Sequence, residues 1–206
     1  MALLSTEEQP ARTRVGSRVA ARAFAVLLAV ITWTTGARAD ELFQPAALEY
    51  QVKAAFLFNF AKFVEWPAEK LGDGSNPIIV GILGKDPFGS SIDETFRGKT
   101  VNGRDVIVRR ISQASDAGRC HILFVASSEK GRLEEILLSV ASSSVLTVSE
   151  IKQFVERGGM ISFTTDENKV RLEINVGAAE RAGVKISSKL LKLAQVVWAG
   201  PADRGN

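Results

Sequence analysis

The chain has 206 residues, 46% of them hydrophobic and 24% charged, which is ordinary for one globular domain. Its formal net charge of +3 comes from the first 39 residues, which hold five arginines and two glutamates. Taking five from 26 basic and two from 23 acidic residues leaves 21 of each, so the rest of the chain is neutral. A neutral domain lacks the basic surface that neutralises phosphates, so we expect no nucleic-acid binding.

Residues 1–39 are typical of a Sec-type signal peptide. Arginines precede an apolar run over 23–33, and Ala37-x-Ala39 fits a signal-peptidase site, with cleavage after Ala39. An uncleaved membrane anchor is the alternative, but the run is only about half of the roughly 20 residues that span a bilayer. We therefore expect a protein exported to the periplasm, whose domain covers residues 40–206 and has no membrane span after cleavage.

A helix is predicted over Ala46–Val64, ending before Pro67. Helical spacing predicts a core-facing stripe of Leu48, Val52, Ala55, Phe56, Asn59, Phe60 and Phe63. The solvent side is expected to carry Glu49, Lys53, Lys62 and Glu65.

A second apolar flank lies off this stripe, formed by Leu57, Phe58, Ala61 and Val64. One helix of a small domain seldom needs apolar residues on both flanks, and aromatic residues are enriched where proteins meet. Both interpretations of the second flank stay open at this point, a core role and contact with another chain. The predicted partner-contact residues are Phe58, Lys62, Glu65 and Trp66.

Apolar runs of strand length follow at 77–83, 121–125 and 145–148, and residues 106–111 alternate like a strand. A hairpin is predicted from 160–164 and 170–176. Helices are expected at 90–96, 130–140, 150–156 and 188–198, with Ser149 capping the third. This alternation predicts a single α/β domain of Rossmann-like type, with a central mixed sheet and helices on both faces.

The turn after the first strand is a possible ligand-binding turn, with Gly84, Lys85, Asp86 and Gly89 as its residues. Ligands of α/β sheets bind at such strand ends, and a glycine-rich turn with a lysine can hold an anion. The segment matches neither the P-loop nor the dinucleotide fingerprint. A tight turn that begins at Asp86-Pro87 is the preferred interpretation.

Cys120 and His121 are the only cysteine and the only histidine. Neighbours on a strand point to opposite faces, so the two cannot act as a nucleophile and its base. We expect a buried thiol and a structural histidine, and predict no catalytic residue, no metal site and no cofactor.

The segment Val52–Pro67 (VKAAFLFNFAKFVEWP) resembles the opening helix of the YfiR-like family of exported bacterial proteins. Further segments resemble later signatures of that family in order: Val80–Gly84, Asp86–Phe88, Cys120–Phe124, Leu146–Ser149, Gly158–Ile161, Val170–Asn175 and Ile186–Ala194.

The resemblance implies a non-enzymatic periplasmic regulator. Members of the YfiR type repress a membrane-bound diguanylate cyclase by binding its periplasmic domain, which lowers cyclic-di-GMP and biofilm formation, and they can form homodimers. A sensor kinase is the other membrane partner that we consider. The best-studied type has further cysteines that form disulfides, whereas this chain has only Cys120, which excludes redox control by an internal disulfide. The alternative function is a periplasmic sensor domain that binds a small molecule without catalysis.

Overall fold

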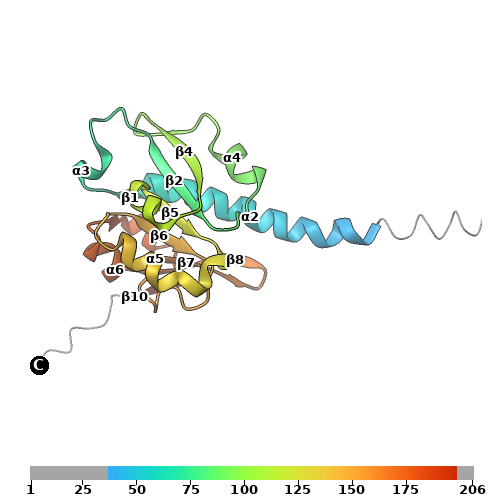
Figure 1. Ribbon diagram of the computed structural model, residues 1–206. Helices are drawn as coiled ribbons and strands as arrows, with labels where there is room; N and C mark the ends of the chain where they lie inside the picture. The colour runs from blue at the N-terminus through green and yellow to red at the C-terminus, as the bar shows by residue number, and fades with distance from the viewer. Residues whose placement is uncertain (1–36, 199–206) are drawn as a thin grey trace, which may run out of the picture. The chain divides into compact units, whose positions relative to one another are not determined.

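The computed structural model describes residues 37–198, with side chains for residues 47–195. The predicted signal peptide lies outside this part of the chain except for its last three residues, which belong to helix α2 (Ala37–Phe63). The chain divides after Pro45, and the compact unit that begins at Ala46 carries the sheet (Figure 1).

Short helices and strands follow α2. The helical segments are α3 (Ala68–Leu71), α4 (Ser90–Phe96), η1 (Ala114–Arg119), η2 (Ser127–Arg132), α5 (Leu133–Val140), α6 (Val176–Arg181) and α7 (Ser188–Leu191). The strands are β1 (Val64–Glu65), β2 (Ile78–Leu83), β3 (Thr100–Val101), β4 (Arg104–Ile111), β5 (Ile122–Val125), β6 (Leu146–Ser149), β7 (Ile161–Asp166), β8 (Lys169–Asn175), β9 (Lys185–Ile186) and β10 (Val196–Trp198).

The main sheet has eight strands in the order β10-β8-β7-β6-β5-β2-β4-β3. Strands β4, β2, β5, β6 and β7 are parallel, while β3 and β8 run antiparallel to their neighbours β4 and β7. The first strand of the parallel set, β2, therefore lies inside the sheet with β4 on one side and β5 on the other. This order creates a switch point between β2 and β5, where doubly wound sheets bind ligands. Strands β1 and β9 form a separate antiparallel pair.

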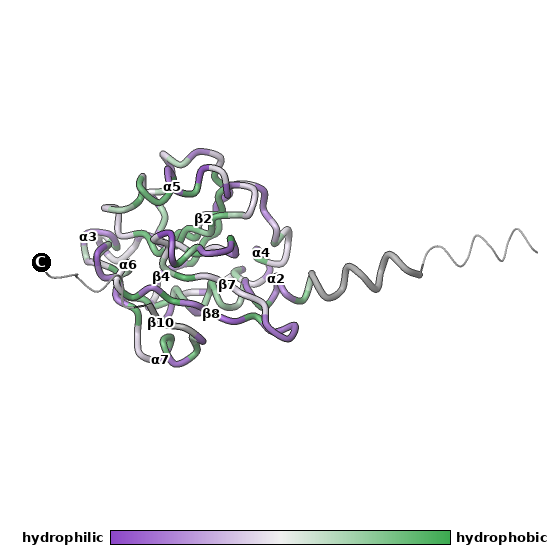
Figure 2. The backbone as a smooth tube through the Cα atoms, turned by 90° about the horizontal axis from the view of Figure 1, so that it is seen from below, coloured by the Kyte–Doolittle hydropathy of each residue, from purple (hydrophilic) through white to green (hydrophobic). Residues whose placement is uncertain are grey.

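Both faces of β2, β5 and β6 are covered, which explains their continuous apolar sequences. On β5, Ile122 and Phe124 point to the core shared with α2, whereas Leu123 and Val125 point to the core shared with α5. The sheet thus separates α2 from α5 (Figure 1). Most of β2 is hydrophobic in Figure 2, as a strand covered on both faces requires.

The structure confirms the α/β fold with a mixed sheet, and α4 has the predicted bounds. The predicted hairpin is β7 and β8, joined by Glu167 and Asn168, which both have positive φ.

Two predicted helices are wrong. Residues 151–158 form turns, although Ser149 Oγ still accepts a hydrogen bond from the amide of Ile151 at 3.1 Å. The last predicted helix stops with α7, and residues 196–198 instead form β10, which pairs in parallel with β8. The sequence Val-Val-Trp has high β-propensity, and the edge of β8 offers these residues backbone hydrogen-bond partners, so they form a strand.

Candidate functional site

Helix α2 turns a different flank to the sheet from the predicted one. Leu57 and Ala61, on the second flank, are almost completely buried, whereas Leu48 and Val52, on the predicted core stripe, are 59% and 45% exposed. Phe60 is buried as predicted. The helical period is correct but the expected core face is wrong for the first turns, because a helix with two apolar flanks does not show by period alone which flank meets the sheet.

Phe58, a predicted partner contact, lies in the core. Its ring meets the ring of Phe96 edge to face, with centroids 5.6 Å apart. The ammonium groups of Lys62 and Lys99 lie 4.9 and 4.7 Å from the centroid of the Phe58 ring, so two exposed lysines cover it from outside.

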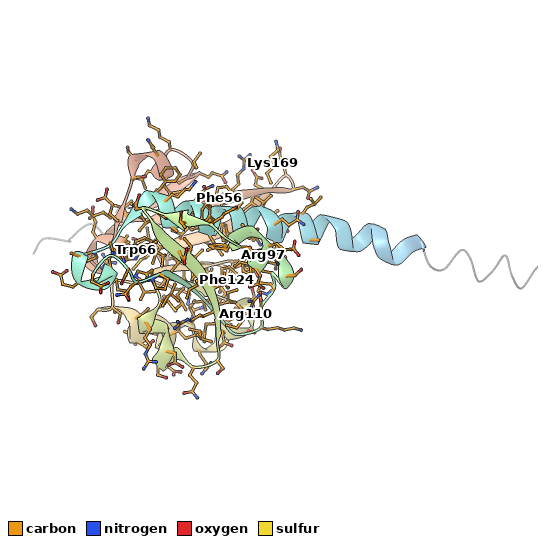
Figure 3. The ribbon with its side chains drawn as sticks, turned by 90° about the horizontal axis from the view of Figure 1, so that it is seen from above. Phe56, Trp66, Arg97, Arg110, Phe124 and Lys169 are labelled. Carbon is orange, nitrogen blue, oxygen red and sulfur yellow. The ribbon has the colours of Figure 1, made fainter. Side chains whose placement is uncertain are left out.

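Trp66, the second aromatic residue predicted to contact a partner, is 8% exposed (Figure 3). Its indole Nε1 donates a hydrogen bond to the carbonyl oxygen of His121 at 3.1 Å, which attaches the end of the α2 segment to β5. Lys62 and Glu65 are exposed. The four predicted residues therefore do not form one exposed patch, and their contact with another chain stays a prediction.

The exposed apolar residues of α2 lie on the other flank. Leu48, Val52 and Ala55 follow one another at helical spacing, and all three are exposed; we call them the α2 strip. The half-buried Phe56 borders it and packs against Phe163 of β7, with ring centroids 6.1 Å apart (Figure 3). The α2 strip is a row of apolar side chains in water on a helix whose other flank already fills the core.

A buried ion-pair cluster joins α2 to the sheet. The Lys53 side chain is only 4% exposed, and its Nζ lies 2.6 Å from Oε1 of Glu49 and 2.6 Å from Oε2 of Glu150. The hydroxyl of Tyr50 donates to the Glu150 carboxylate at 3.2 Å, and Ser127 Oγ donates to it at 3.1 Å. A buried ammonium requires such partners, because an unpaired charge in the interior is costly.

This cluster lies at the carboxyl edge of the parallel strands. Ser127 follows β5 and Glu150 follows β6, at the edge where ligands of doubly wound sheets bind. Burial, and next the charge of Glu150, raise the pKa of Tyr50 to about 12. The polar groups of the cluster bond to one another, an arrangement that anchors α2 across the strand ends.

The sequence pattern missed this cluster, because it placed Glu49 and Lys53 in solvent. Their spacing of four residues was visible and is typical of a helical ion pair. Glu150, the partner that accounts for the burial of Lys53, lies 97 residues further along the chain and left no local signal.

The predicted ligand turn is packed against η2. Gly84 has φ +94°, and a Cβ there would lie 2.5 Å from Ser128 Oγ, so the position requires glycine. The amide of Lys85 donates to Ser128 Oγ at 2.9 Å, while Asp86 Oδ1 accepts from the amide of Phe88 at 2.7 Å. The backbone at the switch point is thus bonded within the chain, as the tight-turn interpretation predicts, and only the Lys85 side chain extends into solvent.

Arg110 of β4 holds this turn to α4. Its Nε donates to Asp86 Oδ2 at 2.9 Å, and its terminal nitrogens donate to both Asp93 oxygens, at 2.7 and 2.6 Å. The same guanidinium also donates to the carbonyl oxygen of Gly89 at 3.0 Å. Hydrogen bonds from Arg110 hold the pKa of Asp93 below its usual value. Asp86 and Gly89 are therefore both engaged by one arginine, which the strand pattern of β4 did not reveal.

His121 and Cys120 have the structural roles that the sequence predicted. The Nδ1 atom of His121 accepts from the amide of Ile79 at 3.0 Å, and Nε2 lies 3.3 Å from the carbonyl oxygen of Lys70, which assigns its proton to Nε2. Burial, and next the charge of Lys70, lower its pKa to about 4. Cys120 is 2% exposed, and burial raises the pKa of its thiol, so it is a poor nucleophile.

A groove runs along the outer side of β4. Its volume is about 360 Å³, and its lining comes from β4 and from the end of α4 with the residues that follow it. Its walls include Phe96, Val106 and Val108, with Arg97 and Lys99 at the rim. Within residues 37–198, no group of three or more His, Cys, Asp or Glu side chains is placed to hold a metal ion.

None of the helices in the described part of the chain has both the length and the apolarity needed to cross a bilayer.

Comparison with known proteins gives one family and several distantly similar solved structures, two of which follow. The sequence profile described as YfiR/HmsC-like matches residues 50–195. A conserved domain protein from Vibrio cholerae O1 biovar eltor is 13% identical with a TM-score of 0.45, and the match covers 58% of this chain and 54% of that one. The ABC domain in complex with L-Trp from Streptococcus pneumoniae is also 13% identical with a TM-score of 0.45, and covers 74% and 60%. Similarity this distant does not bear on function.

Proposed function

Because the chain belongs to the YfiR/HmsC-like family, as its motifs predicted, we propose that it is a non-enzymatic regulator of cyclic-di-GMP signalling in the periplasm. In this proposal a Sec-type signal peptide, residues 1–39, exports the domain 40–206. The domain binds the periplasmic part of an inner-membrane signalling protein, a diguanylate cyclase in the first place and a sensor kinase in the second. Binding represses the cyclase and lowers cyclic-di-GMP.

The observation that carries the partner-binding role is the exposed α2 strip. Leu48 and Val52 are large exposed apolar residues, and Val52 lies within the residues that the family profile matches. Burying them against a partner removes apolar surface from water. The core does not need them, since the opposite flank of α2 covers the sheet. Exposed Lys62 and Glu65, near the end of α2, are further candidates for the rim of this contact.

Phe58 and Trp66 are not available for this contact. Both belong to the main core, and substituting either one would destabilise the domain before it altered any contact. The proposal therefore moves the apolar centre of the partner surface from the second flank of α2 to the α2 strip.

We do not extend the proposal to small-molecule sensing at Gly84–Gly89, because the polar groups of that turn bond to Ser128 and Arg110 of the same chain.

The test compares a deletion strain complemented with the native chain or with variants. Deletion should raise cyclic-di-GMP and biofilm, and the native chain should restore both to their original levels. Val52→Glu should fail to restore them, because truncating or charging a central apolar contact weakens binding by roughly tenfold or more.

Leu138→Glu is the matched control, since Leu138 is 72% exposed on α5, far along the chain from the α2 strip. It should restore repression fully, and circular dichroism should show both variants folded. An unchanged cyclic-di-GMP level in the deletion strain would refute the regulatory role. Equal repression by Val52→Glu and the native chain would refute the surface and leave the role standing.

A further inference from the structure

The outer edge of β4 is largely unpaired. On its inner side, residues 106–111 pair with the whole of β2. On its outer side, β3 pairs only with Arg104 and Asp105, and one more hydrogen bond runs from the amide of Val106 to the carbonyl oxygen of Lys99. Beyond Val106, no residue in the described part of the chain pairs with this edge.

The backbone pattern shows which groups are free. The N–H and C=O of one residue point to the same edge of a strand, and successive residues alternate between the two edges. Since Val106 points outward, so do Val108 and Arg110. Their amides and carbonyls form a short row at which a further strand can pair, and natural edges of this kind are commonly shortened or covered.

The groove along β4 lies beside this row. Phe96 of α4 and the β4 residues Val106 and Val108 give the groove apolar walls. An added strand could therefore form backbone hydrogen bonds with β4 and bury its apolar side chains in the groove. An edge strand flanked by a helix is the geometry by which several domains capture extended peptides.

The charges around the edge are mainly positive. Arg97 and Lys99 are exposed at the groove rim, and Arg109 is exposed on the other face of β4 (Figure 3 labels Arg97 and Arg110). None of these three lies within ion-pair distance of a carboxylate in residues 47–195, whereas Asp93 is taken by Arg110. Asp105 is the one acidic residue of the lining that Arg110 does not hold.

These charges favour an acidic occupant over a second copy of the chain. If Val108 and Arg110 of one β4 paired antiparallel with Arg110 and Val108 of another copy, Arg109 of each strand would lie directly opposite Arg109 of the other. Like charges across a strand pair are destabilising.

We propose that the β4 edge, from Val106 to Arg110, binds an extended polypeptide segment with acidic side chains, which adds to the main sheet as a further strand. Its backbone pairs with Val108 and Arg110, and its apolar side chains enter the groove beside Phe96. Its carboxylates point to the opposite face of the sheet, where they meet Arg109, while Arg97 and Lys99 at the groove rim add positive charge around the strand. This site is separate from the α2 strip, so either can fail while the other stands.

The test uses the mature chain, residues 40–206, and a capped hexapeptide of alternating valine and glutamate as the probe. Binding should shift the amide NMR signals of β4 and slow hydrogen exchange at Val108 and Arg110. A peptide of alternating valine and lysine should bind about tenfold more weakly. The valine–glutamate peptide with N-methylated backbone amides should also bind about tenfold more weakly, because it cannot complete the ladder.

Two kinds of variant locate the site. Arg109→Glu should weaken binding of the valine–glutamate peptide by about tenfold, whereas Lys130→Glu, which changes an exposed lysine on η2, should not. Val108→Pro removes an outward donor, which an edge strand tolerates, and should abolish the peptide's protection of the Arg110 amide, while Val108→Thr should keep it.

Three results would overturn the proposal: no β4 shift at millimolar probe, equal binding of the lysine or N-methylated peptides, or concentration-dependent protection of β4 without any peptide. The last result would identify a second copy as the occupant.

Discussion

Between pH 7 and pH 5, acidification should destabilise this protein mainly through one side chain, His121. The imidazole is 5% exposed, and both ring nitrogens have backbone partners that require the neutral form with its proton on Nε2. Protonation would put a second hydrogen opposite the amide of Ile79 and a charge near the ammonium of Lys70. Burial first, and Lys70 second, therefore hold the pKa of His121 at about 4 rather than 6.5.

The sign follows from linkage between protons and folding. The unfolded chain, with a histidine pKa near 6.5, takes up the proton at a higher pH than the folded chain does. The stabilisation is complete above pH 6.5, is lost as the pH falls toward 4, and stays lost below that. The free energy of unfolding should fall by about 2 kcal/mol between pH 7 and pH 5, and by about 3 kcal/mol by pH 4.

Urea unfolding at pH 7, 6, 5.5 and 5 measures this loss, and the imidazole signals in a proton NMR titration give the pKa directly. The chain has one histidine, so both readings are assigned without ambiguity. Over this range most carboxylates stay ionised, and the raised pKa of Glu173 acts in the opposite direction. His121→Gln is the control: it should be less stable than the native chain at pH 7 but nearly independent of pH down to 5.

An imidazole that titrates near 6.5 in the folded protein would refute the reasoning. So would a free energy of unfolding that is equal at pH 7 and pH 5, or a pH dependence that persists in His121→Gln.

Three further predictions test the packing of α2. Leu57→Ala should cost about 2–5 kcal/mol in urea unfolding and Val52→Ala no more than about 0.5 kcal/mol, and the reverse order would mean that the predicted stripe is the core face after all. Lys53→Met should cost about 3–5 kcal/mol because it leaves Glu150 half-buried without its cation, and a neutral effect would show the pair to be dispensable. The single tyrosine, Tyr50, should ionise near pH 12 by absorbance at 295 nm and at a lower pH in Glu150→Gln, whereas a native midpoint near 10 would show that it is not held by the cluster.

Local patterns predicted much of the fold. The apolar runs of β2, β5 and β6 gave buried strands because a strand covered on both faces needs apolar residues at every position. The pattern over 160–176 gave the hairpin of β7 and β8, and Glu167 and Asn168 at its turn both adopt positive φ. The burial of Cys120 followed from the apolar run that it opens.

Local patterns failed where a helix had two apolar flanks that could each face the core, or where a segment could form either a helix or a strand. The apolar flanks of α2 have the same period, so only the position of the sheet selects Leu57 over Val52. Residues 196–198 have an amphipathic helical pattern, but an open edge of β8 makes them a strand.

By itself, the sequence determined the family, the α/β class, the strand runs and the structural histidine, because each depends on residue type and spacing within one segment. The tertiary structure alone decided which flank of α2 is exposed, that Lys53 is buried beside Glu150, that Arg110 closes the turn at Asp86, and that β4 has a free edge. Each of these features depends on which segments, far apart in the sequence, come into contact. Burial and strand pairing arise from those contacts and cannot be inferred from either segment alone.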